Sequence, residues 1–511
     1  MSELDPRTPI LVGVGQASDP IDAADYHRWS AVHLAAAASA AAIADAGLDA
    51  AQIDTVAGVR QFEISTPFAT APLGRSDNYP RSVAQRVGAD PRRAVLEVAG
   101  GQAPQHLITE FAKAIARGEA GTVLIFGSEA ISTTRAFAGK DDAPDFTERV
   151  EGELEDRGYG LEGLMEPVQM EHGLVDGPSQ YAVFENARRA RAGVSRGEYA
   201  QEMGELFAPF TAVAEANPFA AARTTRSADE LVEVTERNRM IADPYPRFLV
   251  ARDQVNQGAA AVLTSVGAAR EAGVPEQKWV FLHGYADHRD VNVLDRPDLA
   301  TSPASVQAAR TAIERAGLTL DDLASFDLYS CFPIAVLNIC DGLGLSPTDP
   351  RGLTLTGGLP FFGGAGNNYS MHAVAETVAR LRANPGSAGF VGANGGALSK
   401  YSAAVYSCTP RAWTEWSDAE AQAGFDAVTG PPLSTAPSGE GRVETYTVKY
   451  GRSGATGVII GRLPDGSRFV ATTAPGDEKT VAALVGDDAF GRTVQVSGDG
   501  THNIASVADA G

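Results

Sequence analysis

Short apolar runs alternate with helix-patterned segments along the first 127 residues. The apolar runs have the length of strands and cover residues 9–15, 53–59, 94–98 and 122–126. Helices are predicted from an N-cap at Ser30 to Ala46, with Gly47 closing the helix, and over residues 102–116. Because strands that alternate with helices of this length call for helical crossovers, the pattern predicts an α/β fold with parallel pairing.

The same pattern returns in the second part of the chain. Strands are predicted over residues 259–263, 279–284, 389–391 and 403–407. The sequence Ala-Asp-Ala-Gly-Leu at 44–48 leads into the strand that begins at Ile53, and Glu-Arg-Ala-Gly-Leu at 314–318 leads into Leu323 in the same way. Each is a helix closed by glycine, an acidic turn and then a strand. The repetition predicts two related α/β halves.

Three segments do not follow this alternation. The segment between the halves is rich in Glu and Arg with helical spacing over 181–191 and 196–207, which predicts an inserted helical lobe. After residue 412 a connector rich in Pro, Gly and charge precedes an alternating segment with a hairpin turn at Pro464-Asp-Gly466, which predicts a small all-β, OB-like module. The predicted parts are a first half (1–127), an inserted loop domain (128–247), a second half (248–412), a linker (413–440) and a C-terminal β domain (441–511).

The chemistry-bearing stretch of the second half is Phe326-Asp-Leu-Tyr-Ser-Cys-Phe-Pro333. It is an apolar run that ends in polar residues before an apolar-periodic segment over 334–345. This pattern predicts a buried strand that delivers Tyr329, Ser330 and Cys331 into a turn before a helix, at the sheet edge where α/β proteins bind ligands. The glycine-rich stretch 356–370 follows, and its glycines let backbone approach a ligand closely.

These two stretches resemble the second half of a thiolase, closest to the sterol-carrier-protein type. There, His-Asp-Cys-Phe is followed by Gly-Gly, a spacer and Gly-His-Pro; here the motifs are Tyr329-Ser-Cys-Phe332 and Gly363-Gly-Ala365. With its β-rich tail, the chain resembles the bacterial thiolase-like proteins of type 1, relatives of acetyl-CoA acetyltransferases. The resemblance implies two βαβ halves in a five-layer αβαβα sandwich, a loop domain over the substrate, and CoA or acyl-CoA as ligand without a tightly bound cofactor.

The resemblance also shows which catalytic groups are missing. A thiolase acylates a cysteine at a helix N-terminus and activates it with histidine. The resemblance places Gly101 at the nucleophile's position and Gly364 at a histidine's position, so a cysteinyl intermediate cannot form at 101. Cys331 and Tyr329 remain as candidate catalytic residues; their alternatives are a small buried hydrophobe and an aromatic packed in the pocket floor. Candidate substrate-binding residues are Gly101, Gln102, Gly363, Gly364, Asn367 and Asn368.

Two histidines lie near these motifs. His106 and His372 fall on predicted helices, where a surface or core role is favoured over replacement of the lost base. The three cysteines are scattered, which predicts a reduced, cytoplasmic protein without a metal cluster or disulfide framework. No apolar run reaches the length of a membrane span.

Charge narrows the set of partners. The 511 residues carry 42 basic and 64 acidic side chains, a net charge of −22, which opposes binding to nucleic acid and to anionic membranes. From Gly441 onward there are seven basic and eight acidic residues, so the tail lacks the excess of basic residues that an oligonucleotide-binding barrel has. A small-molecule ligand is expected, with a monomer or homodimer and a possible protein partner through the C-terminal domain.

Three hypotheses follow. The first is a thiolase-like protein of lipid metabolism with a degenerate active site, which binds CoA or acyl-CoA without thiolase activity. The second is an active acyltransferase or retro-aldol lyase that uses Cys331 and Tyr329. The third is a scaffold protein that works through its OB-like tail.

Overall fold

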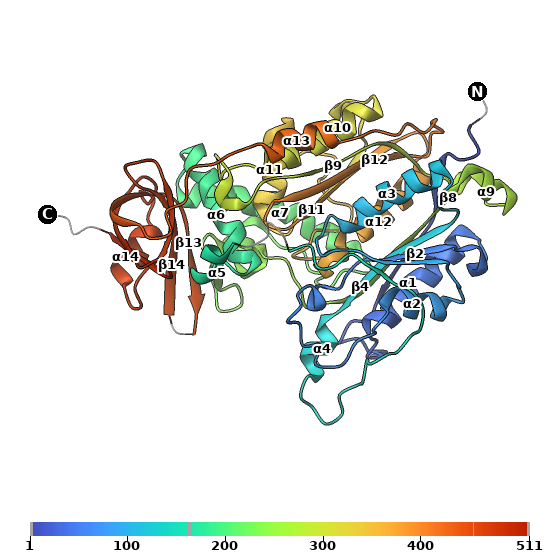
Figure 1. The fold of residues 1–511 in the computed structure, drawn as a ribbon, viewed down its shortest axis with the longest axis horizontal. Coiled ribbons are helices and arrows are strands. Elements are labelled where there is room, and N and C mark those ends of the chain that lie inside the picture. Colours follow the sequence, from blue (N-terminus) through green and yellow to red (C-terminus); the bar gives the residue numbers. More distant parts are fainter. Residues whose placement is uncertain (1–3, 162–165, 453, 508–511) are drawn as a thin grey trace.

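The computed structural model describes residues 4–161, 166–452 and 454–507. Two β-sheets and three layers of helices form the central body, with the inserted lobe and the tail on one side of it (Figure 1). The first sheet has the order β1-β8-β4-β2-β3-β5 and the second β10-β11-β12-β9. The strands of the first are β1 Pro9–Ser18, β8 Asn256–Ser265, β4 Val123–Ala130, β2 Thr55–Gly58, β3 Arg93–Leu96 and β5 Glu155–Asp156. Those of the second are β10 Ser325–Leu328, β11 Ala388–Gly395, β12 Lys400–Ser407 and β9 Phe281–Arg289.

Strand pairing is mixed: the expected parallel pairing is present in both sheets, but other pairs are antiparallel. β2 pairs in parallel with β3 and β4, whereas β8 lies antiparallel between β1 and β4. The chain leaves β4 at Ala130 for the lobe and returns beside it at Asn256, so β8 must run in the opposite direction. β11 and β12 are joined by only four residues, which also makes them antiparallel. Strand β8 thus completes the first sheet, although the predicted boundary at 248 assigns it to the second half.

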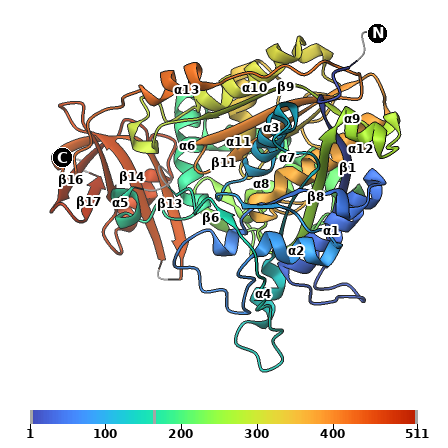
Figure 2. The same cartoon turned by 45° about the vertical axis from the view of Figure 1, so that its right-hand side comes forward.

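The helices form the three α layers of the predicted five-layer sandwich. α3 (Ala103–Arg117) and α12 (Tyr369–Ala383) lie between the sheets and share one apolar core with both (Figure 2). The outer layers are α1 Ala31–Ala46 with α2 Tyr79–Val87 on the first sheet, and α10 Pro303–Ala316 with α11 Pro333–Leu343 on the second. The predicted limits of α1 are confirmed: Ser30 accepts the His33 N–H, and Gly47 closes the helix at φ 71°.

The inserted lobe is mostly helical, as predicted. It contains α4 Ile131–Phe137, α5 Pro167–Glu171, α6 Gly177–Ala192, α7 Arg196–Ala216, α8 Ala228–Val232, β6 Met240–Ala242 and β7 Tyr245–Pro246. Two helices lie elsewhere: α9 (Val266–Glu271) follows β8, and α13 (Ala419–Asp426) lies in the predicted linker. The sequence missed α13 because none of its residues is buried, which leaves no apolar stripe to detect.

The tail is a small closed β-barrel. Its strands are β13 Ser438–Gly451, β14 Gly454–Arg462, β15 Arg468–Thr472, β16 Thr493–Gly498 and β17 Asn503–Val507, with α14 Glu478–Leu484 between β15 and β16. β13 pairs with both β14 and β16, and β17 pairs with β15 and β16, which closes five strands into a ring. The tail is thus a small β module, as predicted, with β17 as the strand that the sequence missed.

The barrel is fixed to the lobe by buried polar contacts. Ala242 of β6 pairs with Lys449 of β13, and Thr445 Oγ1 donates to the Val183 carbonyl of α6 at 2.6 Å. Arg468, which is fully buried, donates to the carbonyls of Leu294 and Arg296 in the second half. If the barrel moved, these buried donors would lose their acceptors without gaining others. The contacts therefore fix the barrel in one position on the body.

Among the described residues no helix is long and apolar enough to cross a bilayer.

Candidate active site

Two strand-to-helix turns meet at the predicted site. The turn between β3 and α3 carries Gly101, and the turn between β10 and α11 carries Tyr329 and Cys331. A Cβ atom built on Gly101 would overlap with Oη and Cζ of Tyr329 and would lie 2.5 Å from the Asn394 carbonyl oxygen. The Tyr329 phenol therefore occupies the space into which any side chain at position 101 would project.

Tyr329 is held in this place by neighbours on all sides. Its side chain is 7 % exposed and packs edge-to-face against Tyr369 with ring centroids 5.4 Å apart. Its backbone N–H donates to the Gly392 carbonyl at 3.1 Å. Burial raises the pKa of the Tyr329 phenol, and so does the nearby Cys331. The phenol is consequently protonated at neutral pH.

Cys331 lies beneath the lobe and is 7 % exposed. The Asn394 amide Nδ2 lies 4.0 Å from its Sγ and donates to the Tyr181 hydroxyl at 2.7 Å. Burial raises the pKa of the Cys331 thiol to about 12, although hydrogen bonds from Tyr181 and Asn394 act in the opposite direction. A thiol with this pKa is not a nucleophile or a base at neutral pH.

The glycine-rich loop reaches the same turns through its asparagines. Asn367 accepts the Gly100 N–H at 3.0 Å and donates to the Arg60 carbonyl at 2.8 Å. Asn368 donates to the Gly127 carbonyl at 2.7 Å. Both predicted ligand-binding amides thus tie the loop to backbone of the first half.

The two glycines of this loop differ. Gly363 has φ 125° and a built Cβ would lie 2.7 Å from Gln257, so it is required by the backbone. A Cβ on Gly364 would meet its neighbours Arg252, Leu359 and Ala251 at 3.4–3.6 Å, which is ordinary contact. Position 364 therefore has room for at least the first atom of a side chain.

Two buried acceptors beside Gly101 have no partner. Oε1 of the predicted residue Gln102 and Oδ1 of Asn394 are both buried, and neither accepts a hydrogen bond from any described residue. A Cβ on Gly395 would overlap with the Gln102 oxygen, which places Gln102 against the Asn394 strand end. Unpaired buried acceptors are uncommon in folded proteins and require a donor. The site therefore offers two oxygen atoms to a hydroxyl, amide N–H or thiol.

Sequence reasoning missed a buried carboxyl group next to the Cys331 turn. Glu185 of α6 is fully buried and accepts the Ile334 N–H in the first turn of α11 at 2.7 Å. The hydroxyls of Tyr199 and Tyr245 donate to it at 2.5 and 2.7 Å. Burial raises the pKa of Glu185 to about 7, against the effect of these donors. The only signal in the sequence is a glutamate inside the apolar run Tyr-Ala-Val-Phe-Glu at 181–185.

Neither histidine replaces the missing base. His372 is fully buried, Nδ1 contacts Gln16 Oε1 at 2.7 Å, and burial lowers its pKa to about 3. His106 lies 3.4 Å from Asp287 and 3.8 Å from Glu110. Partial burial disfavours the charged His106 ring, but Asp287 outweighs it and raises the pKa to about 9. His372 is thus a core residue, and His106 is a member of an ion pair.

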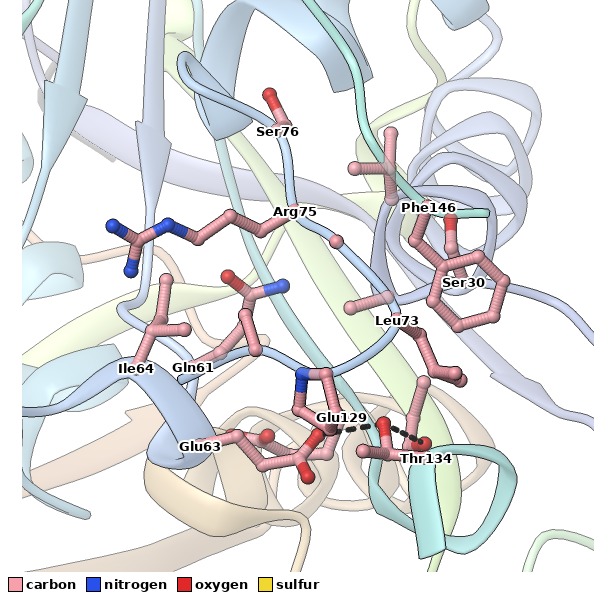
Figure 3. Close-up of a pocket in the computed structure, with 16 residues that line it drawn as sticks. Ser30, Gln61, Glu63, Ile64, Leu73, Arg75, Ser76, Glu129, Thr134 and Phe146 are labelled. Atoms are coloured by element: carbon pink, nitrogen blue, oxygen red, sulfur yellow. Dashed lines mark hydrogen bonds between the residues drawn. The ribbon is translucent and has the colours of Figure 1, made fainter. Parts of the chain in front are cut away.

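A separate small pocket lies in the first half (Figure 3). It is formed by the start of α1, the loop after β2 and the end of β4, with a volume of about 50 Å³. Glu129 and Glu63 lie at its base; Thr134 donates to Glu63 at 3.0 Å, and Glu129 Oε2 is buried without a donor. Burial raises the pKa of both carboxyl groups. The pocket contains none of the predicted site residues and has room for only a few water molecules.

Two sheets, a middle layer of α3 and α12, and paired strand-end turns define a thiolase-fold protein. The family model of the thiolase-like protein type 1 additional C-terminal domain matches residues 420–501. The crystal structure of a monomeric SCP2-thiolase-like protein type 1 from Mycobacterium smegmatis is 49% identical, with 99% of this chain and 100% of that chain covered and a TM-score of 0.86. The chain therefore belongs to the SCP2-thiolase-like proteins of type 1, as the sequence resemblance implies.

More distant structures share the fold. An Ltp2–ChsH2(DUF35) aldolase is 20% identical over 79% of this chain and 98% of that one, with a TM-score of 0.57. Human mitochondrial 3-ketoacyl-CoA thiolase is 16% identical over 80% of this chain and 100% of that one, with a TM-score of 0.56.

A search of curated protein sequences finds no match to this chain.

Proposed function

We propose that this protein binds CoA or an acyl-CoA at the strand-end turns and does not catalyse thiolysis through an acylated cysteine. The observation that carries the proposal is the exclusion of any side chain at position 101 by the Tyr329 phenol. The cysteine that accepts the acyl group in the thiolase mechanism is thus absent, and the Tyr329 phenol occupies the space that its side chain would need. Cys331 does not substitute for it, because its raised pKa keeps it a thiol.

Ligand binding is supported by what remains in the site. Gln102 and Asn394 present unpaired acceptors beside Gly101, where the thiol or an amide N–H of a pantetheine arm would satisfy them. The N-terminus of α3 lies at the same turn, and the free N–H groups of its first turn, Pro104 excepted, are further donors. The lobe covers the turn through Tyr181, so entry of a ligand requires that lobe to move.

Calorimetric titration with CoA, acetyl-CoA and a longer acyl-CoA tests the proposal, beside an assay for thiolysis of acetoacetyl-CoA. We expect saturable binding and no thiolysis. An Asn394→Ala variant should weaken binding, whereas Cys331→Ala should leave it within about twofold. Thiolysis that is lost in Cys331→Ala would contradict the proposal, as would the absence of binding to all three ligands.

A retro-aldol lyase is the second candidate, and the position of Tyr329 favours it. Such a reaction breaks the Cα–Cβ bond of a β-hydroxyacyl-CoA without an acyl-enzyme: the hydroxyl proton passes to water, and the enolate carbon takes a proton from an acid. Tyr329 is a protonated phenol at the centre of the site, and one structure with this fold is an aldolase. The carbonyl product and the shortened acyl-CoA balance the substrate.

Incubation with β-hydroxyacyl-CoA substrates separates the two candidates. Release of a shortened acyl-CoA that is reduced at least about tenfold in Tyr329→Phe would establish the lyase. If no product forms while the CoA ligands still bind, the binding function alone stands.

A further inference from the structure

A second cavity lies where the lobe meets the tail. It has a volume of about 120 Å³ and is formed by the end of α6, the start of α7 and the segment from α8 to β7. Apolar side chains form most of its wall: Met203, Val232, Val234, Met240, Pro244 and Pro246. Arg189 and Arg196 line the remainder. An apolar cavity with cationic groups on one side is complementary to an amphipathic anion.

Arg189 carries a buried donor without an acceptor. Its side chain is 1 % exposed, stacks on Phe490 with Cζ 4.5 Å from the ring centroid, and donates from Nη2 to the Tyr446 hydroxyl at 3.1 Å. Its only carboxylate neighbour among the described residues is the exposed Asp487, 3.7 Å from Nη1. Nε is buried and has no hydrogen-bond partner within residues 4–161, 166–452 and 454–507. A buried charge in this condition is costly unless a further anion completes its shell.

Arg196 does not need a further anion, because its own charge is already paired. Both of its terminal nitrogens bind the buried carboxylate of Asp243, and Nη1 also donates to the Tyr446 hydroxyl at 3.1 Å. This ion pair neutralises Arg196, whereas Arg189 has only the longer 3.7 Å contact with the exposed Asp487. The weaker pairing leaves Arg189 as the group that can take a further carboxylate.

The size and wall of the cavity limit the rest of the ligand. A cavity of roughly 150 Å³ lined by apolar side chains accommodates the six carbons of benzene, so about 120 Å³ accommodates up to about five chain carbons. That is the tail of a four- to six-carbon acid whose carboxylate group lies at the edge of the cavity on Arg189. Carboxylates bind guanidinium groups through two parallel, charge-assisted hydrogen bonds, and Nε can donate one of the two. Apolar walls then favour an unbranched chain over a second polar group.

We propose that this cavity binds a short aliphatic carboxylate of four to six carbons, with the carboxylate on Arg189 and the chain against Met203 and Val232. Arg189 itself links the lobe to the tail, because it lies on α6 while its partners Tyr446, Asp487 and Phe490 belong to the tail. The cavity is distinct from the strand-end turns: Tyr199 lines it, and Tyr199 and Glu185 lie between it and Ile334 at the start of α11. The proposal therefore does not depend on CoA binding.

Calorimetric titration of the full chain with hexanoate tests the proposal. We expect saturable 1:1 binding and a concentration-dependent rise in melting temperature. Hexanamide, which has the same shape without the charge, should bind at least about tenfold more weakly. Arg189→Lys keeps the charge and loses the planar fork, so it should bind hexanoate at least about fivefold more weakly while the tail stays docked.

Two further variants separate the site from a general charge effect. Val234→Trp changes an exposed residue of the cavity wall and should block entry without affecting the fold. Arg191→Met removes a half-exposed arginine of the same helix that pairs with Asp298, and it should bind hexanoate as the parent chain does. Equal binding of hexanoate and hexanamide, unchanged binding in Arg189→Lys, or no saturable binding up to about 20 mM would each overturn the proposal.

Discussion

The strand-end turns and the lobe–tail cavity differ in whether space remains beside their polar groups. At the turns, the space for a nucleophile at position 101 is filled by Tyr329, and Cys331 is kept neutral by burial. In the cavity, space remains open beside Arg189, whose Nε has no acceptor. The contrast shows that packing alone can exclude a side chain, because any residue larger than glycine at position 101 would meet a steric conflict.

Gly101→Cys should have the largest effect on stability. The new Cβ overlaps with the Tyr329 phenol and approaches the Asn394 carbonyl, so the free energy of unfolding should fall by about 3 kcal/mol. Urea denaturation monitored by circular dichroism measures the change. The variant should also have no thiolase activity, because its neighbour Tyr329 supplies no base.

A double-mutant cycle with Tyr329→Ala sharpens this result. Removal of the phenol frees most of the space, so Gly101→Cys should cost about 1 to 2 kcal/mol less in the Tyr329→Ala background than in the parent chain. Some cost should remain, because the Asn394 carbonyl is backbone and cannot be removed. Strictly additive effects would show that Tyr329 does not occupy the position 101 space in solution.

Glu185 connects the two regions and should make stability depend on pH. Its folded pKa of about 7 lies above the ordinary value of 4.5, so the folded state binds the proton more tightly than the unfolded state. Its contribution is fully present below pH 4.5 and is lost as pH rises to 7, by about 2 to 3 kcal/mol. Glu185→Gln keeps an acceptor for the Ile334 N–H, and it should remove this component from pH-dependent urea denaturation.

Comparison of the two chains across pH isolates the Glu185 contribution. Other buried carboxyls such as Asp327, whose pKa burial raises to about 6, titrate in both proteins and cancel in the difference. The stability advantage of the parent over Glu185→Gln should therefore shrink between pH 4.5 and 7 and level off above it. A difference that does not change with pH would show that the pKa of Glu185 is not raised in the folded state.

The parts of this fold that were predictable from sequence are those with local causes. Ser30 and Gly47 mark the ends of α1 because capping acts within one turn of the helix. The direction of β8 depends on where a lobe of more than a hundred residues returns, which no local pattern records. The sequence likewise placed Gly101 and Tyr329 in one site, but their overlap in space is a contact across more than two hundred residues. Glu185 was missed because a helical glutamate normally faces water.

Cys331 should be far less reactive than Cys408. With a pKa of about 12 its thiolate population at pH 8 is roughly 10⁻⁴, so alkylation by iodoacetamide should be at least about a hundredfold slower than at half-buried Cys408. Peptide mass spectrometry after timed quenching measures both rates in one sample. Binding of an acyl-CoA that opens the lobe over Tyr181 should narrow this ratio, and equal rates without ligand would show that the turns are already open.

The smallest effect is expected at the histidine pair that closes the tail on the lobe. His172 Nε2 accepts the Asn503 N–H at 2.8 Å, Nδ1 contacts the Val168 carbonyl, and the ring stacks on His502 at 4.9 Å. Burial lowers the pKa of His172, as does His502, while Glu171 has a weaker opposite effect. Its stabilising contribution is therefore present above pH 6.5 and is lost as pH falls below it. His172→Phe should cost about 1 kcal/mol at pH 8 and less at pH 5, and amide hydrogen exchange at Asn503 measures it locally. Equal cost at both pH values would mean that the pKa of His172 is not lowered in the folded state and that the contact between tail and lobe does not depend on pH.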